Sequence, residues 1–187
     1  HENSGMVFIA MGGNFLSATP DTSYTAEALR NCMLTVHVST KLNRSHLVTG
    51  KRALILPSLG RSDEDIQASG RQFVSVENSM GVVHSSTGKL KPLSKELLSE
   101  PAIIAGIAKA TLKQNHVDWS AMVDDYDRIR DHIEAVIPGF EDYNKRVRQP
   151  SGFYLPNNAR NGSFEPIGGR AKFTINELPD NALKSGE

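Results

Sequence analysis

The sequence has little of what several kinds of functional site require. Its 187 residues include a single cysteine, Cys32, which excludes an internal disulfide and a cysteine-cluster metal site within the chain. Basic and acidic residues number 21 each, and no basic run occurs, so a nucleic-acid binder held mainly by phosphate contacts is disfavoured. No apolar run approaches the roughly 20 residues that a membrane-spanning helix needs. Residues 1–5 are polar and unlike a secretory leader, so we expect a cytoplasmic protein.

The motifs of several well-known sites are also missing. There is no Gly-x-Ser-x-Gly elbow, no P-loop, and no Gly-x-Gly-x-x-Gly after the first predicted strand. The six histidines are scattered, without the i, i+4 spacing of a helical metal site. The acids within residues 124–127 fall on a predicted helix and point around it, so we interpret them as a solvated face. We therefore predict no catalytic residue and no metal ligand in this chain.

A strand followed by a glycine pair is the feature around which the first part of the sequence is organised. Residues 7–10 are consecutive apolar residues, typical of a strand buried on both faces. Gly12 and Gly13 follow at its carboxyl end, where the backbone can turn sharply and approach a ligand. Asn14 adds an amide that both donates and accepts hydrogen bonds. A tight turn that binds no ligand is the alternative interpretation.

A second strand is predicted at residues 33–38, and a polar run, 39–46, follows it. If the two strands are parallel neighbours, Ser39, Thr40 and Asn43 lie beside the Gly12–Asn14 turn at one edge of the sheet. The hydroxyls, amide and cations of this run could then hold a phosphate and a base. A solvated loop is the alternative, and it is the commoner fate of such runs.

The remaining pattern predicts further strands and helices. Strands are expected at 53–57, 72–77 and 80–84, and helices from Thr22 or Ser23 to 31, from Ser99, from Asp118 or Ser120 to 136, and at 140–147. After residue 148 we expect extended segments, with a hairpin and a strand at 168–173. The predicted fold is thus α/β: a three-layer sheet with flanking helices, followed by helices and irregular β segments.

Several segments together, in order and spacing, resemble one family. They are residues 11–15 (MGGNF), 35–46 (TVHVSTKLNRSH), 53–57 (ALILP), 80–84 (MGVVH), 98–101 (LSEP), 138–143 (PGFEDY), 148–155 and 169–173. The sequence resembles an interior portion of the molybdopterin oxidoreductases, closest to the formate-dehydrogenase-like alpha subunits. The resemblance covers nearly the whole chain.

This resemblance implies a parent protein that holds molybdenum through two molybdopterin guanine dinucleotides, usually with a 4Fe-4S cluster near the amino terminus. It implies that residues 1–115 are the later half of an α/β domain binding one pterin guanine dinucleotide. Residues 116–148 would form a helical segment, and 149–187 an irregular β segment leading to a missing carboxyl-terminal domain. Within the strand-end loop at 38–43, the family often has an acid and a Thr-Glu-Thr-like run. This sequence has Val38-Ser39 and Leu42-Asn43-Arg44 instead.

The expected function is therefore that of a cofactor-binding fragment of a molybdopterin-dependent oxidoreductase. We expect the fragment alone to hold no cofactor, to be inactive and to associate with itself, because its partners are the missing amino- and carboxyl-terminal domains of the parent chain. The alternatives are a self-standing α/β module that binds a mononucleotide or phosphate, and a structural domain without a ligand. The residues expected to bind the cofactor are Gly12, Gly13, Asn14, Val38, Ser39, Thr40 and Asn43.

Overall fold

The computed structural model describes residues 6–113, 116–164 and 168–177. The elements follow in the order β1 (Val7–Met11), α1 (Phe15–Ala18), α2 (Thr22–Asn31), β2 (Leu34–Ser39), the 3-10 turn η1 (Arg44–Leu47), β3 (Arg52–Pro57), β4 (Ile66–Gln67), β5 (Gly70–Arg71), β6 (Val74–Glu77), β7 (Val82–Ser86), α3 (Glu100–Thr111), α4 (Trp119–Asp124), α5 (Asp127–Val136), α6 (Tyr143–Val147) and β8 (Phe153–Tyr154).

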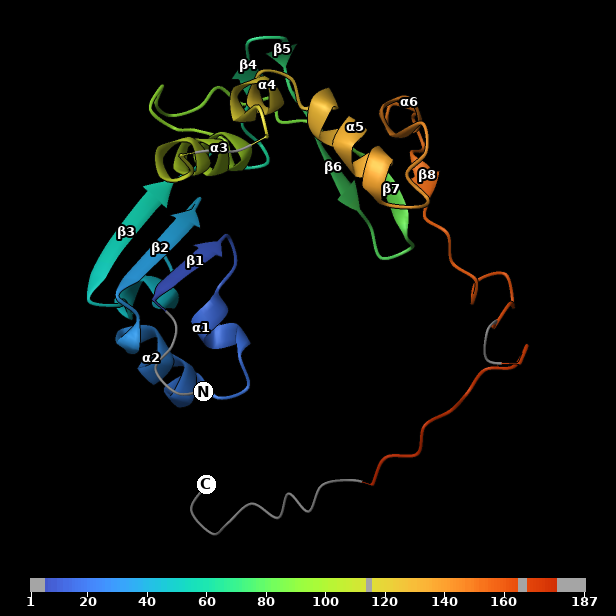
Figure 1. The fold of residues 1–187 in the computed structure, drawn as a ribbon, viewed down its shortest axis with the longest axis horizontal. Coiled ribbons are helices and arrows are strands. Elements are labelled where there is room, and N and C mark those ends of the chain that lie inside the picture. The colour runs from blue at the N-terminus through green and yellow to red at the C-terminus, as the bar shows by residue number, and fades with distance from the viewer. Residues whose placement is uncertain (1–5, 114–115, 165–167, 178–187) are drawn as a thin grey trace.

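The first three strands form a parallel sheet with β2 in the centre. Met11 pairs with Val38, and Val38 pairs with Leu56, so the carboxyl ends of all three strands meet at one edge. In Figure 1 the arrowheads of β1, β2 and β3 point towards the segment that carries α3, and the second sheet lies beyond it. The predicted parallel arrangement of the first two strands is confirmed.

Two helices cover one face of this parallel sheet. Leu16 of α1 and Leu29 of α2 form a buried cluster against Phe8 of β1. The side chain of Asp21 accepts a hydrogen bond from the amide of Tyr24 at 2.8 Å, and so caps α2. The cap therefore lies just before Thr22, where the sequence predicted Thr22 or Ser23 itself.

The opposite face of the parallel sheet carries exposed apolar side chains. Val7, Ile9, Met11 and Leu54 are 42–55% exposed, although parallel sheets normally have both faces covered. The prediction that the first strand is buried on both faces is therefore wrong, because α1 and α2 lie on one side of it. The α/β class is confirmed, but the described residues supply a helical layer on one face and no third layer.

A second, antiparallel sheet of β6, β7 and β8 packs with α5 and α6 around a separate cluster of Val83, Tyr143, Val147 and Phe153. The buried guanidinium of Arg130 fixes α5 to this sheet. It donates to the carbonyl of Phe73 at 3.2 Å, pairs with Asp127, and lies 4.0 Å from the centre of the Phe73 ring. Burial alone would raise the pKa of Asp127, but hydrogen bonds from Arg148 and Arg130 outweigh it and hold that pKa below its usual value.

The predicted helix from Asp118 or Ser120 to residue 136 is interrupted, and the prediction of one helix is wrong. Asp125, with φ −151°, is extended between α4 and α5. The amide of Tyr126 donates to Oε1 of Gln72 at 3.0 Å rather than into a continuous helix. A contact with a residue distant in sequence thus breaks a helix that the local pattern would continue.

The hydroxyl of Tyr126, just before α5, lies in a buried network with residues just before β4 and at the start of α3. It donates to Oδ2 of Asp65 at 2.5 Å and lies 2.6 Å from Oγ of Ser99. Ser99 also caps α3, as predicted, because its Oγ accepts from the amide of Ala102 at 3.4 Å. Burial and the hydrogen bond with Asp65 raise the pKa of Tyr126 above the ordinary value for tyrosine.

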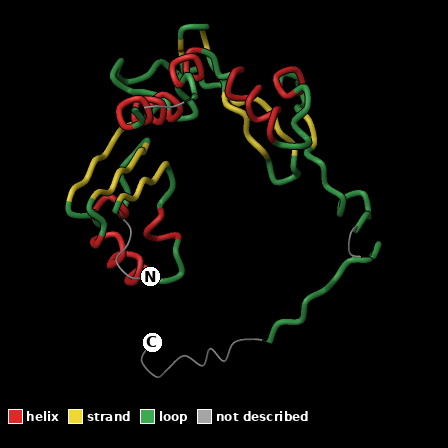
Figure 2. Tube along the Cα trace, in the orientation of Figure 1, coloured by secondary structure: helices red, strands yellow, loops and turns green. Residues whose placement is uncertain are grey.

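The last part of the described chain has no regular structure. Figure 2 shows it as a long loop leaving the second sheet after β8. Phe173 and Ile175 are almost fully exposed, and no strand is present within 168–177. The predicted hairpin and strand at 168–173 are therefore wrong, since no strand in the described residues pairs with this segment. No helix in the described ranges is long and apolar enough to span a membrane.

Replacing Tyr126 with phenylalanine should lower the free energy of unfolding by about 1.5–3 kcal/mol, because a buried hydrogen bond to a carboxylate is lost. Urea unfolding measures this change. The control is Tyr154→Phe, since Tyr154 is exposed and no partner for its hydroxyl is recorded in the described chain. Equal denaturation midpoints for the two variants would contradict the prediction.

Because the Tyr126 pKa is raised in the fold, the wild type should also lose stability as the pH rises above about 10.

Candidate functional site

The carboxyl edge of the parallel sheet begins with a glycine turn. Gly12 and Gly13 have φ values of +63° and +67°, in the left-handed region that favours glycine. The amide of Gly12 donates to the carbonyl of Val38 at 2.8 Å, so the turn stays attached to the end of β2. An added Cβ at Gly13 would meet no atom within 4 Å, which leaves open space above this position.

Hydrogen bonds hold the two predicted strand-end segments together. Nδ2 of Asn43 donates to the carbonyl of Gly13 at 2.8 Å. Oγ of Ser45 donates to Oδ1 of Asn14 at 3.0 Å and accepts from the amide of Leu16 at 3.1 Å. The prediction that the Gly12–Asn14 turn lies beside the 38–43 loop at one sheet edge is confirmed.

The predicted site residues differ in what they can offer a ligand. Asn14 and Thr40 are exposed, and within the described chain no acceptor is recorded for the amides of Gly13 and Asn14 or for Nδ2 of Asn14. The side chain of Val38, in contrast, is fully buried and cannot reach a ligand. Asn43 uses Nδ2 on Gly13 and Oδ1 on the amide of Ser45, at 2.9 Å, so its amide supports the edge.

Sequence reasoning missed the importance of His46 at this edge. His46 is buried, and its Nδ1 accepts from the amide of Asn43 at 3.0 Å while its Nε2 lies 3.1 Å from Oγ of Ser39. Together with the Asn43 side chain this forms a capping box around η1. The available signal was the spacing of Asn43 and His46, three residues apart. Ser39 is thus buried and engaged by the protein rather than exposed at the edge.

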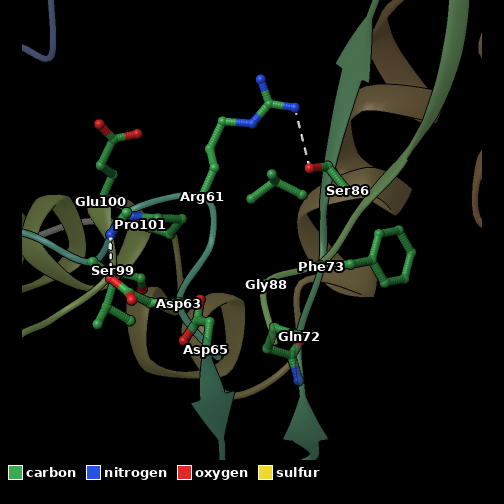
Figure 3. Close-up of a pocket in the computed structure, with 13 residues that line it drawn as sticks. Arg61, Asp63, Asp65, Gln72, Phe73, Ser86, Gly88, Ser99, Glu100 and Pro101 are labelled. Atoms are coloured by element: carbon green, nitrogen blue, oxygen red, sulfur yellow. Dashed lines mark hydrogen bonds between the residues drawn. The ribbon is translucent and has the colours of Figure 1, made fainter. Parts of the chain in front are cut away.

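A small cavity of about 90 Å³ lies between the segment after β3, the start of α3 and the strands β6 and β7. Figure 3 shows Arg61 and Glu100 extending to the same side of it, with Arg61 donating to Oγ of Ser86 at 3.2 Å. Oε1 of Glu100 would lie 3.7 Å from a Cβ added to Gly12, which puts this carboxylate beside the glycine turn. This cavity is far too small to enclose a nucleotide, so a nucleotide would have to lie across the carboxyl edge of the parallel sheet.

Metal-ligating groups do not gather in the described residues. No set of three or more histidine, cysteine, aspartate or glutamate side chains is placed there to hold a metal ion. Beside the Glu100 carboxylate, the edge offers the Gly13 and Asn14 amides, which have no acceptor in the described residues, and the exposed hydroxyl of Thr40. The exposed cation of Arg61 has no ion-pair partner in the described chain. This donor set suits a ligand with anionic or carbonyl oxygens.

Comparison with known proteins shows that the sequence is similar to part of much larger proteins, among them one named as an oxidoreductase. It matches no known family profile. It is 55% identical over 174 residues to the uncharacterized oxidoreductase Rv2900c of Mycobacterium tuberculosis, a match that covers 92% of this chain and 22% of that protein. It is 50% identical over 181 residues to protein YdeP of Escherichia coli K12, covering 95% of this chain and 24% of that protein.

The chain thus spans about a quarter of the length of the curated relatives it matches. The name and length of the Rv2900c relative support the expectation that the chain is similar to a fragment of a larger oxidoreductase. Neither relative's name specifies a cofactor, so the molybdopterin assignment remains a proposal.

The left-handed turn gives a direct test of the edge's geometry. Gly13→Ala should lower the free energy of unfolding by roughly 1–2 kcal/mol, because an L-residue is strained there although the space is open. The matched control is Gly106→Ala within α3, where an added Cβ also meets no atom within 4 Å. That change should stabilise the protein by about 0.5–1 kcal/mol. Two shifts of the same sign in urea unfolding would refute the assigned turn conformation.

Proposed function

We propose that this chain is the part of a larger molybdopterin-dependent oxidoreductase that binds one pterin guanine dinucleotide at the carboxyl edge of its parallel sheet. The observation that carries the proposal is the meeting of the Gly12–Asn14 turn and the 38–43 loop at that edge, with donors that have no acceptor among the described residues. The family resemblance supplies the identity of the cofactor. The oxidoreductase name and greater length of the Rv2900c relative agree with it.

The residues at the edge fit the nucleotide end of such a cofactor. The amides of Gly13 and Asn14 form a short run of backbone donors without an acceptor in the part of the chain that the structure describes, an arrangement that binds phosphate oxygens. Arg61 could add a positive charge from the neighbouring cavity mouth. Nδ2 of Asn14 and the exposed hydroxyl of Thr40 would remain for the ribose or the base. Open α/β sheets bind ligands at this edge, which agrees with the proposed placement.

The proposed role of the chain is binding and positioning. When bound, the molybdenum cofactor supplies the redox chemistry, and the protein supplies orientation and electrostatics. Glu100, beside the glycine turn, could accept hydrogen bonds from ribose hydroxyls or from a base. A 4Fe-4S cluster, if the parent has one, would be held by another part of it, since this sequence has one cysteine.

We extend the proposal to the organisation of the chain. Residues 1–115 would be the later half of the dinucleotide-binding domain, 116–148 a helical segment, and 149–187 a segment leading to a carboxyl-terminal domain. The exposed apolar face of β1 and β3 supports this view, because further parts of a longer protein would cover it. The expected cytoplasmic location likewise stays a prediction.

The 187-residue chain purified alone should therefore associate with itself in a concentration-dependent way, as light scattering can measure. Ile9→Lys should weaken the association because it charges the exposed face of the parallel sheet. Leu42→Lys is the control, since Leu42 is more exposed than Ile9 but lies in the loop after β2. A wild-type chain that stays strictly monomeric at high concentration would overturn this prediction.

The proposed site is tested most simply at Asn14 in the longer protein. Asn14→Ala should lower cofactor occupancy strongly and the melting temperature only slightly. Nδ2 is the proposed donor to the ligand and contributes about 1–3 kcal/mol to binding, while loss of the bond from Ser45 to Oδ1 costs about 0.5–1.5 kcal/mol of stability. Molybdenum content and released guanine nucleotide are measured per protein, beside the melting temperature. Asn31→Ala, at the end of α2, is the matched control and should leave both unchanged. Normal occupancy in Asn14→Ala would argue against the site.

A further inference from the structure

The buried imidazole of His46 is bonded on both sides to the segments that form the strand-end edge. Its Nδ1 accepts from the amide of Asn43 at 3.0 Å. A backbone amide can only donate, so Nδ1 is assigned as unprotonated and the ring proton as lying on Nε2. Nε2–H then donates to Oγ of Ser39, 3.1 Å away. In this neutral form the ring connects the end of β2 to the start of η1.

Further hydrogen bonds connect the turn that contains His46 to Gly13 and Asn14, the residues proposed to bind the ligand. Asn43, held by His46, donates through Nδ2 to the carbonyl of Gly13 at 2.8 Å. Ser45, in the same turn, donates to Oδ1 of Asn14 at 3.0 Å. Because Oδ1 of Asn14 is fixed in this way, Nδ2 of Asn14 points away from Ser45 and has no acceptor among the residues that the structure describes. The positions of Gly13 and Asn14 thus depend on the η1 turn, which the hydrogen bonds of His46 hold closed.

The titratable and charged groups around His46 come from β2 and from its own loop. The titratable group packed against it is His37 of β2, whose ring centre lies 4.9 Å away and whose pKa is lowered by burial and by His46. Phe8 of β1 lies next to His37 and is uncharged. The charged groups of its own loop, Lys41 and Arg44, are exposed cations, and in the described residues no carboxylate pairs with His46.

Protonation of His46 would change its bonding in a specific way. A proton on Nδ1 would face the amide of Asn43, which is itself a donor, so that bond would be lost. The new N–H would be left with the carbonyl of Asn43, which is 3.2 Å from Nδ1. The turn would then hold Asn43 by its carbonyl alone, and the contact that fixes the Gly13 carbonyl would loosen.

We infer that His46 is a positioning residue for the nucleotide edge and supports it only as a neutral imidazole, an inference that rests on the proposed function. The nucleotide affinity of this edge therefore falls when the ring is protonated or removed. His37 lies behind His46 and contributes no hydrogen bond to the edge: its Nε2 is buried without a partner in the described chain.

The test uses the full-length protein freed of its cofactor, with guanosine 5′-diphosphate as the probe and calorimetric titration between pH 8 and pH 5. This interval spans the ordinary titration range of histidine. The wild type should bind the probe at pH 8, and its affinity should fall more steeply towards pH 5 than that of a variant without the ring, because protonation of the ring loses one buried hydrogen bond. His46→Leu should bind about tenfold more weakly than the wild type at pH 8 and lose less affinity towards pH 5 than the wild type does. The comparison is between the two profiles, because the terminal phosphate of the probe itself titrates near pH 6 in both experiments. His46→Gln, which retains a donor and an acceptor, should recover part of the pH 8 affinity with a pH profile no steeper than that of His46→Leu.

His132→Leu is the matched control, because His132 is an exposed histidine on α5 and should leave the affinity and the pH profile unchanged. Hydrogen exchange supplies a second readout without any ligand: the Asn43 amide should be protected in the wild type at pH 8 and exchange faster in His46→Leu. Equal exchange in the two proteins would overturn the inference.

The remaining outcomes separate the inference from the proposed function. If the wild type binds the probe and His46→Leu binds it equally well with the same pH profile, His46 does not position the edge, while the nucleotide site survives. If the wild type fails to bind the probe at pH 8, both the site and the inference about its positioning residue fall.

Discussion

The parallel pairing of β1 with β2 is the interaction on which the rest of the candidate site depends. Its register places Met11 opposite Val38, so the chain leaves both strands at the same edge. The amide of Gly12 then adds one more bond to the carbonyl of Val38, beyond the end of the strand. A slip of one residue would turn every side chain of β1 to the other face and move the glycine turn away from the 38–43 loop.

Polar groups at this edge fall into two kinds, and the division gives the site its chemical character. The buried ones, Ser39, Ser45 and His46, are bonded to the protein and close the turn beneath the edge. Those at the surface, the amides of Gly13 and Asn14, have no acceptor recorded in the described chain. Because unpaired buried groups cost free energy while exposed donors are satisfied by water, a ligand oxygen can replace that water at little cost.

The sequence predicted features that depend on local signals. The approximate bounds of β1 and β2 follow from apolar patterning, and Ser99 caps α3 as its type and position indicate. The cap of α2 is Asp21, one residue before the predicted Thr22 or Ser23. What depends on distant partners was not predictable. The break before α5 exists because Tyr126 bonds with Gln72 and Asp65, residues about sixty positions earlier. The covered and uncovered faces of β1 look alike in sequence because apolar residues occupy both.

The same distinction applies to the site. That the Gly12–Asn14 turn meets the 38–43 loop followed from strand order and parallel direction. Which groups remain free did not, because Asn43 looked like a ligand contact until its amide was seen bonded to Gly13 and Ser45. The role of His46 depends on which ring nitrogen carries the proton, and this is assigned only when the Asn43 amide is seen beside Nδ1.

The most direct test of the central claim is an electron cryo-microscopy structure of the full-length protein isolated with its cofactor. The account predicts density for a guanine nucleotide at the carboxyl edge of the parallel sheet, with its oxygens within hydrogen-bond distance of the Gly13 and Asn14 amides. A structure in which the nucleotide lies elsewhere, and side chains of the rest of the protein fill this edge, would contradict it.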